Sequence, residues 1–121
     1  MTKRILVADD EQVLQMLIED TLSDEGYDVT VVENGKRAKD MILDDSHRFD
    51  LVIVDYMMPE LTGMEVIIAV KQTLSSPPPF LMLTARSLDS DASAYLDEGA
   101  DGFMSKPFKP SDLVEKVADL L

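Results

Sequence analysis

Five polar residues stand where short apolar runs end, and their side chains suit the binding of a metal ion and of phosphate. They are Asp9 and Asp10 after residues 5–8, Asp55 after residues 51–54, Thr84 after residues 80–83, and Lys106 after residues 102–105. Carboxylates are ligands for hard divalent cations, and an ammonium group binds phosphoryl oxygens. In an open parallel sheet the carboxyl ends of the strands share one edge, where ligands bind. We therefore expect these residues to form one anionic pocket.

The charge of such a pocket must be compensated. Three ionised carboxylates about 5 Å apart repel one another by roughly 3 kcal/mol per pair at an effective dielectric constant of 20. Mg²⁺ relieves this repulsion and keeps water molecules that an incoming phosphate can replace. Taken singly, these residues have simpler structural interpretations, as helix caps, a β-branched strand end and turn residues. Their coincidence at four strand ends favours the metal and phosphate site.

Alternating strands and helices are predicted to position these residues. The unbroken apolar runs are typical of strands covered on both faces, and weaker runs at 27–32 and 102–105 complete five strands. Stripes at helical spacing predict helices at 13–22, from Asn34 or Gly35, at 64–74, around 92–96, and from Pro110 to Leu120. This order predicts an α/β fold, with a parallel sheet and helices on both faces.

Composition limits the classes of function. The 121 residues correspond to one domain, residues 1–121, and the net charge of −13 disfavours binding to nucleic acid or to anionic membranes. The chain has no cysteine, which excludes thiolate chemistry. It also has no apolar run long enough for a signal peptide or a membrane span, so we expect a cytoplasmic location.

Several motifs in the chain resemble the receiver domain of bacterial two-component response regulators. They are Asp9-Asp10-Glu11, Val54-Asp55-Tyr56-Met57-Met58-Pro59 with Gly63, Leu83-Thr84-Ala85, Gly99-Ala100-Asp101 and Lys106-Pro107-Phe108. The resemblance covers essentially the whole chain. It implies a flavodoxin-like, doubly wound (βα)5 fold with strand order 2-1-3-4-5, and it places the site between the first and third strands.

The resemblance also implies a role for each residue of the pocket. Asp55 would accept a phosphoryl group from a kinase phosphohistidine, with Lys106 and Thr84 binding the phosphoryl oxygens. Asp10 and Asp55 would bind Mg²⁺ directly, Asp9 would act mainly through water, and the backbone carbonyl of Met57 would complete the protein ligands. Mn²⁺ would substitute for Mg²⁺.

Further positions take their expected roles from the same resemblance. Thr84 and Phe103 match the switch pair, in which the hydroxyl moves toward the phosphoryl group and the ring turns inward. Met57 and Arg86 occupy positions that set the lifetime of the phosphoryl group, and with Met57 we expect slow hydrolysis. The bond between Lys106 and Pro107 is expected to be cis.

The function predicted from the sequence is a phosphorylation-controlled signalling module, not an enzyme with its own metabolic substrate. Its expected partners are a sensor histidine kinase or histidine phosphotransfer protein, and an output domain or target protein. The sequence leaves undecided whether phosphorylation also produces a homodimer. One alternative is a phosphatase or a flavin-binding protein, but Met57 stands where a haloacid-type phosphatase has its acid. The other is an interaction module that does not depend on phosphorylation. Whether the chain stands alone or belongs to a longer regulator is left open.

Overall fold

A computed structural model describes residues 2–44, 48–84 and 99–121 of the chain. These residues include nine helices and strands. In chain order they are β1 (Arg4–Ala8), α1 (Gln12–Asp24), β2 (Asp28–Val32), α2 (Gly35–Leu43), β3 (Leu51–Asp55), α3 (Gly63–Thr73), β4 (Phe80–Thr84), β5 (Gly102–Ser105) and α5 (Pro110–Leu120). The helix predicted around residues 92–96 lies outside the described residues. None of the described helices is long and apolar enough to cross a bilayer.

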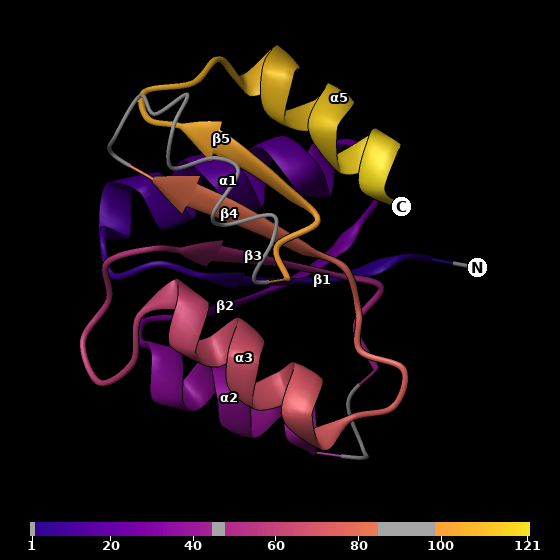
Figure 1. Ribbon diagram of the computed structural model, residues 1–121. Coiled ribbons are helices and arrows are strands. Elements are labelled where there is room, and N and C mark those ends of the chain that lie inside the picture. Colours follow the sequence, from indigo (N-terminus) through magenta and orange to yellow (C-terminus); the bar gives the residue numbers. More distant parts are fainter. Residues whose placement is uncertain (1, 45–47, 85–98) are drawn as a thin grey trace.

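The five strands form one parallel sheet in the order β2-β1-β3-β4-β5 (Figure 1). In the middle of this sheet, Ile5 of β1 pairs with Val29 of β2 on one side and with Leu51 of β3 on the other. The chain winds outward from β1 in one direction and then, through β3, in the opposite direction. This arrangement confirms the order 2-1-3-4-5, and it places the switch point of the sheet between β1 and β3.

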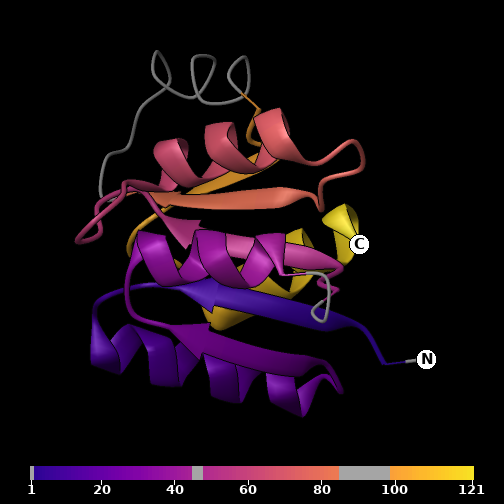
Figure 2. The ribbon, with the colours of Figure 1, turned by 90° about the horizontal axis from the view of Figure 1, so that it is seen from below.

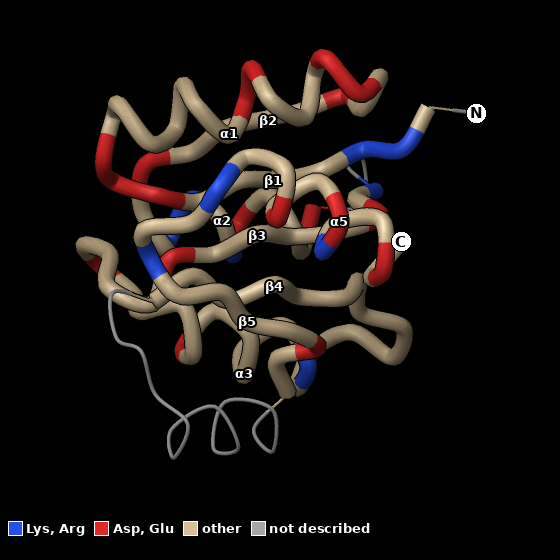
Figure 3. Tube along the Cα trace, turned by 90° about the horizontal axis from the view of Figure 1, so that it is seen from above, with Lys and Arg blue, Asp and Glu red and all other residues tan. Residues whose placement is uncertain are grey.

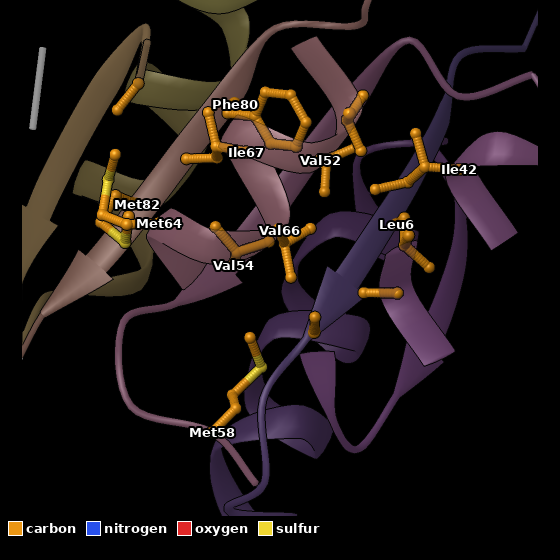
Figure 4. Packing of buried hydrophobic residues seen from close by; sticks show 14 of the residues in the cluster. Leu6, Ile42, Val52, Val54, Met58, Met64, Val66, Ile67, Phe80 and Met82 are labelled. Atoms are coloured by element: carbon orange, nitrogen blue, oxygen red, sulfur yellow. The ribbon is translucent and has the colours of Figure 1, made fainter. Parts of the chain in front are cut away.

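Helices cover both faces of the sheet, and each face has its own apolar core (Figures 1 and 2). Successive side chains of a strand point to opposite faces. In β1, Leu6 and Ala8 therefore pack with α2 and α3, whereas Ile5 and Val7 pack with α1 and α5. Figure 4 shows the first of these cores. Burial on both faces explains why the strands read as unbroken apolar runs in the sequence.

Local signals in the sequence set the ends of the helices. The Asn34 side chain accepts a hydrogen bond from the Arg37 N–H at the start of α2. Thr62 and Glu65 form a capping box at the start of α3, in which each side chain accepts from the other residue's N–H. After α1, Gly26 adopts φ +91°, a left-handed conformation that glycine reaches without strain. These capping and terminating residues determine where the helices begin and end relative to the neighbouring strands.

Candidate functional site

The carboxyl ends of four strands bring the predicted site residues to one edge of the sheet. Asp9 directly follows β1, Asp55 ends β3, Thr84 ends β4, and Lys106 directly follows β5. Backbone hydrogen bonds extend the ladder beyond the strands: the Asp9 N–H donates to Val32 O at 3.1 Å, and the Lys106 N–H donates to Thr84 O at 2.7 Å. The backbone positions of the site are thus fixed by the sheet itself.

The ammonium group of Lys106 joins two of the carboxylates. Its Nζ donates to Asp55 Oδ2 at 2.9 Å and to Asp9 Oδ2 at 3.3 Å. Asp9 is 0% exposed and Asp55 is 5% exposed. Buried charges need partners of opposite charge, and here the Lys106 ammonium is shared by the two buried carboxylates. The structure therefore brings together Asp9, Asp55 and Lys106, which lie far apart in the sequence, and leaves the pocket with a surplus of negative charge.

Burial, together with this negative charge, shifts the ionisation of the site. Burial raises the pKa of both Asp9 and Asp55, and the hydrogen bonds and charge of Lys106 oppose this rise only in part. The negative charge of Asp10 further raises the pKa of Asp55, so this exposed residue lies within electrostatic reach. Burial alone would lower the pKa of Lys106, but its hydrogen bond to Asp55 and the charges of both carboxylates raise it. Lys106 is therefore a firmly charged ammonium.

The oxygen atoms of the pocket fit a small divalent cation. One carboxylate oxygen from each of Asp9, Glu11 and Asp55 lies within 4.8 Å of the others. Mg²⁺ prefers oxygen ligands and binds through a few carboxylates, so the chemistry of these groups suits a small divalent cation. The sequence did not single out Glu11 for this pocket. Its only signal was its place in the acidic run that follows β1.

The loop after β3 approaches Asp55 closely. The backbone N–H of Met57 hydrogen-bonds to the Asp55 carboxylate and lowers its pKa, while the Met57 side chain is 69% exposed. The Gly63 N–H donates to Tyr56 O at 2.9 Å, and a Cβ atom at Gly63 would lie 2.6 Å from Asp55 O. Glycine is therefore required at this position. Within the same loop, Glu60 adopts φ +75°, which is strained for a residue with a side chain.

The predicted switch residues lie on neighbouring strands beside the pocket. Thr84 is buried and pairs with Ser105 across the sheet, while Phe103 pairs with Met82. The Phe103 ring is partly buried against the core under α2 and α3. The peptide bond between Lys106 and Pro107 is cis. Arg86, the second residue expected to influence the phosphoryl lifetime, lies outside the described residues.

A parallel sheet with a lysine and buried carboxylates at its switch point defines a class of signalling domain. The family model described as the response regulator receiver domain matches residues 5–118, and the chain belongs to this family. The sequence resemblance to receiver domains and the predicted fold class are thereby confirmed.

Individual relatives are found among both sequences and solved structures. The chain is 38% identical to the transcriptional regulatory protein CpxR of Escherichia coli strain K12, over 98% of this chain and 49% of CpxR. It is 40% identical to the response regulator MprA of Mycolicibacterium vanbaalenii, over 100% of this chain and 51% of MprA. The structure of Vibrio cholerae chemotaxis protein CheY4 matches with a TM-score of 0.89 and 30% identity, over 100% of both chains. The chain spans about half the length of the curated relatives.

Proposed function

We propose that Asp55 is the phosphoryl acceptor of this receiver domain. The observation that carries the proposal is the contact between Lys106 and the Asp55 carboxylate at 2.9 Å, at the switch point of the sheet. An Asp55 oxygen attacks the phosphorus atom of a phosphohistidine. The new O–P bond forms as the P–N bond breaks, and the electron pair of that bond stays on the imidazole nitrogen, which takes up a proton from solvent. The Lys106 ammonium stabilises the phosphoryl oxygens during transfer.

The same pocket is proposed to hold Mg²⁺, with Mn²⁺ as a substitute. The ligands would be Asp10, Asp55 and the backbone carbonyl of Met57, with Asp9 acting through water. Bound Mg²⁺ supplies neutralisation of charge on the phosphoryl oxygens. The buried acidic oxygens and the net negative charge of the site support this proposal.

Thr84 and Phe103 are proposed to convert phosphorylation into a change of surface. The Thr84 hydroxyl would move to a phosphoryl oxygen, and the Phe103 ring would turn into the space that this movement leaves. Their places on β4 and β5, next to Lys106, support the pairing. Met57 and Arg86 are proposed to control hydrolysis. Since the Met57 side chain has no group that orients water, we expect a long-lived phosphoryl group.

The phosphodonor is proposed to be a sensor histidine kinase or a histidine phosphotransfer protein that docks on α1. Val13 and Met16 are exposed apolar residues of this helix, at 82% and 59%. A cavity of about 350 Å³ connects α1 with the site, and its lining includes Leu17, Lys106 and Phe108. A histidine side chain placed over Asp55 would bring its parent protein against this surface. Acidic residues along α1 favour a basic partner (Figure 3).

We propose a cytoplasmic module that catalyses only its own modification and acts on an output domain or target protein. A homodimer formed on phosphorylation and an interaction role without phosphorylation remain alternatives.

Labelling experiments test the proposal directly. Incubation with radiolabelled acetyl phosphate or a phosphorylated histidine kinase should label the chain only when Mg²⁺ or Mn²⁺ is present. Asp55→Asn should abolish labelling, whereas Asp20→Asn, which removes an exposed carboxylate from α1, should not. Equal labelling of Asp55→Asn would contradict the assignment. Indistinguishable amide spectra of the free and phosphorylated chains, beyond the immediate site, would favour the interaction role.

A further inference from the structure

The Lys106 ammonium already contacts the carboxylate groups beside which an incoming cation would bind. Its Nζ contacts the Oδ2 atoms of both Asp9 and Asp55, the two most buried carboxylates of the pocket. A divalent cation or a phosphoryl group at these oxygens changes the charges around the ammonium at close range. Lys106 must then give up part of its contacts with Asp9 and Asp55, and a charged ammonium needs another acceptor.

Glu11 provides that acceptor. Its Oε1 lies 3.5 Å from Lys106 Nζ, and its side chain is 65% exposed, compared with 0% for Asp9. Glu11 therefore contacts the ammonium from the solvent side of the pocket. The Glu11 N–H donates to Asp9 Oδ1 at 2.8 Å, so the backbone of Glu11 is tied to the pocket while its carboxylate remains at the rim.

A structural role in helix α1 does not account for the Glu11 side chain. Glu11 is the N-cap residue of α1, a position that favours Ser, Thr, Asp or Asn. Its side chain makes no capping hydrogen bond. Within the described part of the chain, the Glu11 carboxylate instead forms an ion pair with Lys106.

There is also space on this side of Lys106. The cavity of about 350 Å³ is lined by both Glu11 and Lys106, and by Leu14 and Pro107. The Lys106 side chain can extend into it with its flexible four-carbon stem. Movement toward Glu11 thus keeps the ammonium paired and clears the inner oxygens.

We propose that Glu11 is a positioning residue that holds the Lys106 ammonium at the rim of the pocket when a divalent cation binds beside Asp9 and Asp55. The inference rests on the proposed function, because it assumes that this pocket binds Mg²⁺. Glu11 acts through Lys106 and is not itself a metal ligand in this scheme. Its carboxylate thereby favours metal binding without touching the metal.

A double-mutant cycle on Mg²⁺ affinity tests this role. Isothermal titration calorimetry at constant ionic strength would measure wild type, Glu11→Gln, Lys106→Ala and the double variant. Glu11→Gln should weaken Mg²⁺ binding about three- to fivefold, the size expected for a partly exposed ion pair. In the Lys106→Ala background the same change should alter the affinity by less than about twofold. Glu19→Gln, an equal change of charge on the exposed face of α1, serves as the matched control and should have no effect.

An equal weakening in both backgrounds would overturn the proposal, because Glu11 would then act as a metal ligand or through its charge alone. An unchanged affinity of Glu11→Gln would also overturn it. If Lys106→Ala does not fold, Lys106→Gln provides the second background. Failure of the proposed function has a different signature, because wild type would then neither bind Mg²⁺ nor be labelled at Asp55. That result would contradict both the proposed function and the role of Glu11. Failure of the present inference alone leaves wild-type binding and labelling intact.

Discussion

The Nζ atom of Lys106 lies 2.9 Å from Oδ2 of Asp55, although 51 positions separate the two residues in the sequence. Lys106 also serves Asp9, so one ammonium holds together the ends of β1, β3 and β5. This contact pairs buried charges in the unmodified domain. Under the proposed function, phosphoryl transfer to Asp55 would also have to rearrange it, so stability and signalling would be coupled through a single side chain.

Loss of the Lys106 ammonium should destabilise the fold. Lys106→Met leaves two buried carboxylates without their cation, and breaking such a pair costs about 3 kcal/mol in free energy of unfolding at pH 7. The cost should shrink at pH 5, because carboxylates with a raised pKa become protonated as the pH falls. Urea unfolding at the two pH values would measure this. Lys109→Met, at an exposed position, is the control and should change stability by less than about 0.5 kcal/mol.

Removal of the Asp9 charge should have the opposite effect. Burial raises the pKa of Asp9, so the folded state binds a proton more readily than the unfolded state, and ionised Asp9 lowers stability above its folded pKa. In metal-free buffer at pH 7, Asp9→Asn should stabilise the domain by about 1 kcal/mol. The gain should vanish as the pH falls toward the ordinary value of 3.8. A gain that is the same at pH 4 and pH 7 would contradict this explanation, and Asp20→Asn tests for a general effect of charge.

Binding of Mg²⁺ should stabilise the folded state. A ligand that binds only the folded chain adds about 2.7 kcal/mol at 100 times its dissociation constant. Thermal unfolding should therefore shift upward with Mg²⁺ and return to its original midpoint after chelation. NaCl at equal ionic strength controls for screening. Asp55→Asn should reduce the shift strongly, and a full shift in this variant would place the cation elsewhere.

A glycine at position 60 should relieve strain. Glu60 adopts φ +75°, where a side chain crowds the backbone and glycine does not. We expect Glu60→Gly to raise the free energy of unfolding by about 0.5–1 kcal/mol. Glu60→Ala keeps the Cβ atom and should bring no such gain. An equal gain over wild type for both variants in chemical denaturation would show that the charge of Glu60, and not its backbone conformation, matters.

The proposed switch should require the Thr84 hydroxyl. In ¹H–¹⁵N spectra, phosphorylation of wild type should shift amide signals near Phe103 and along β5. Thr84→Ala should still be labelled at Asp55, but its spectral changes should remain confined to the immediate site. Thr84→Ser retains the hydroxyl and should restore the wider response. A full response in Thr84→Ala would remove Thr84 from the pathway.

Much of this architecture could be predicted from the sequence because burial leaves a strong pattern. Strands covered on both faces require unbroken apolar runs, and the polar residues that end these runs identified Asp55 and Lys106. Asn34 and Pro110 marked the starts of their helices through capping and backbone geometry. The order of the strands followed from the family resemblance, since hydrophobic periodicity does not contain it.

Other features depend on the placement of individual side chains. The contact between Glu11 and Lys106 joins an exposed carboxylate to a turn lysine, and neither residue belongs to a periodic pattern. The left-handed conformation of Glu60 was also unexpected, because glycine or asparagine would be the usual signal. Both features arise from tertiary closure of the loops at the edge of the sheet.

The peptide hydrogen bond from the Lys106 N–H to Thr84 O has a mechanical consequence. It links the backbone of Thr84, the last residue of β4, to that of Lys106, the first residue beyond β5. The hydroxyl and the ammonium that are proposed to bind the phosphoryl group are therefore carried by two hydrogen-bonded residues. A displacement of one residue should then displace the other. Substitutions at Thr84 and Lys106 should accordingly give combined effects that differ from the sum of their separate ones.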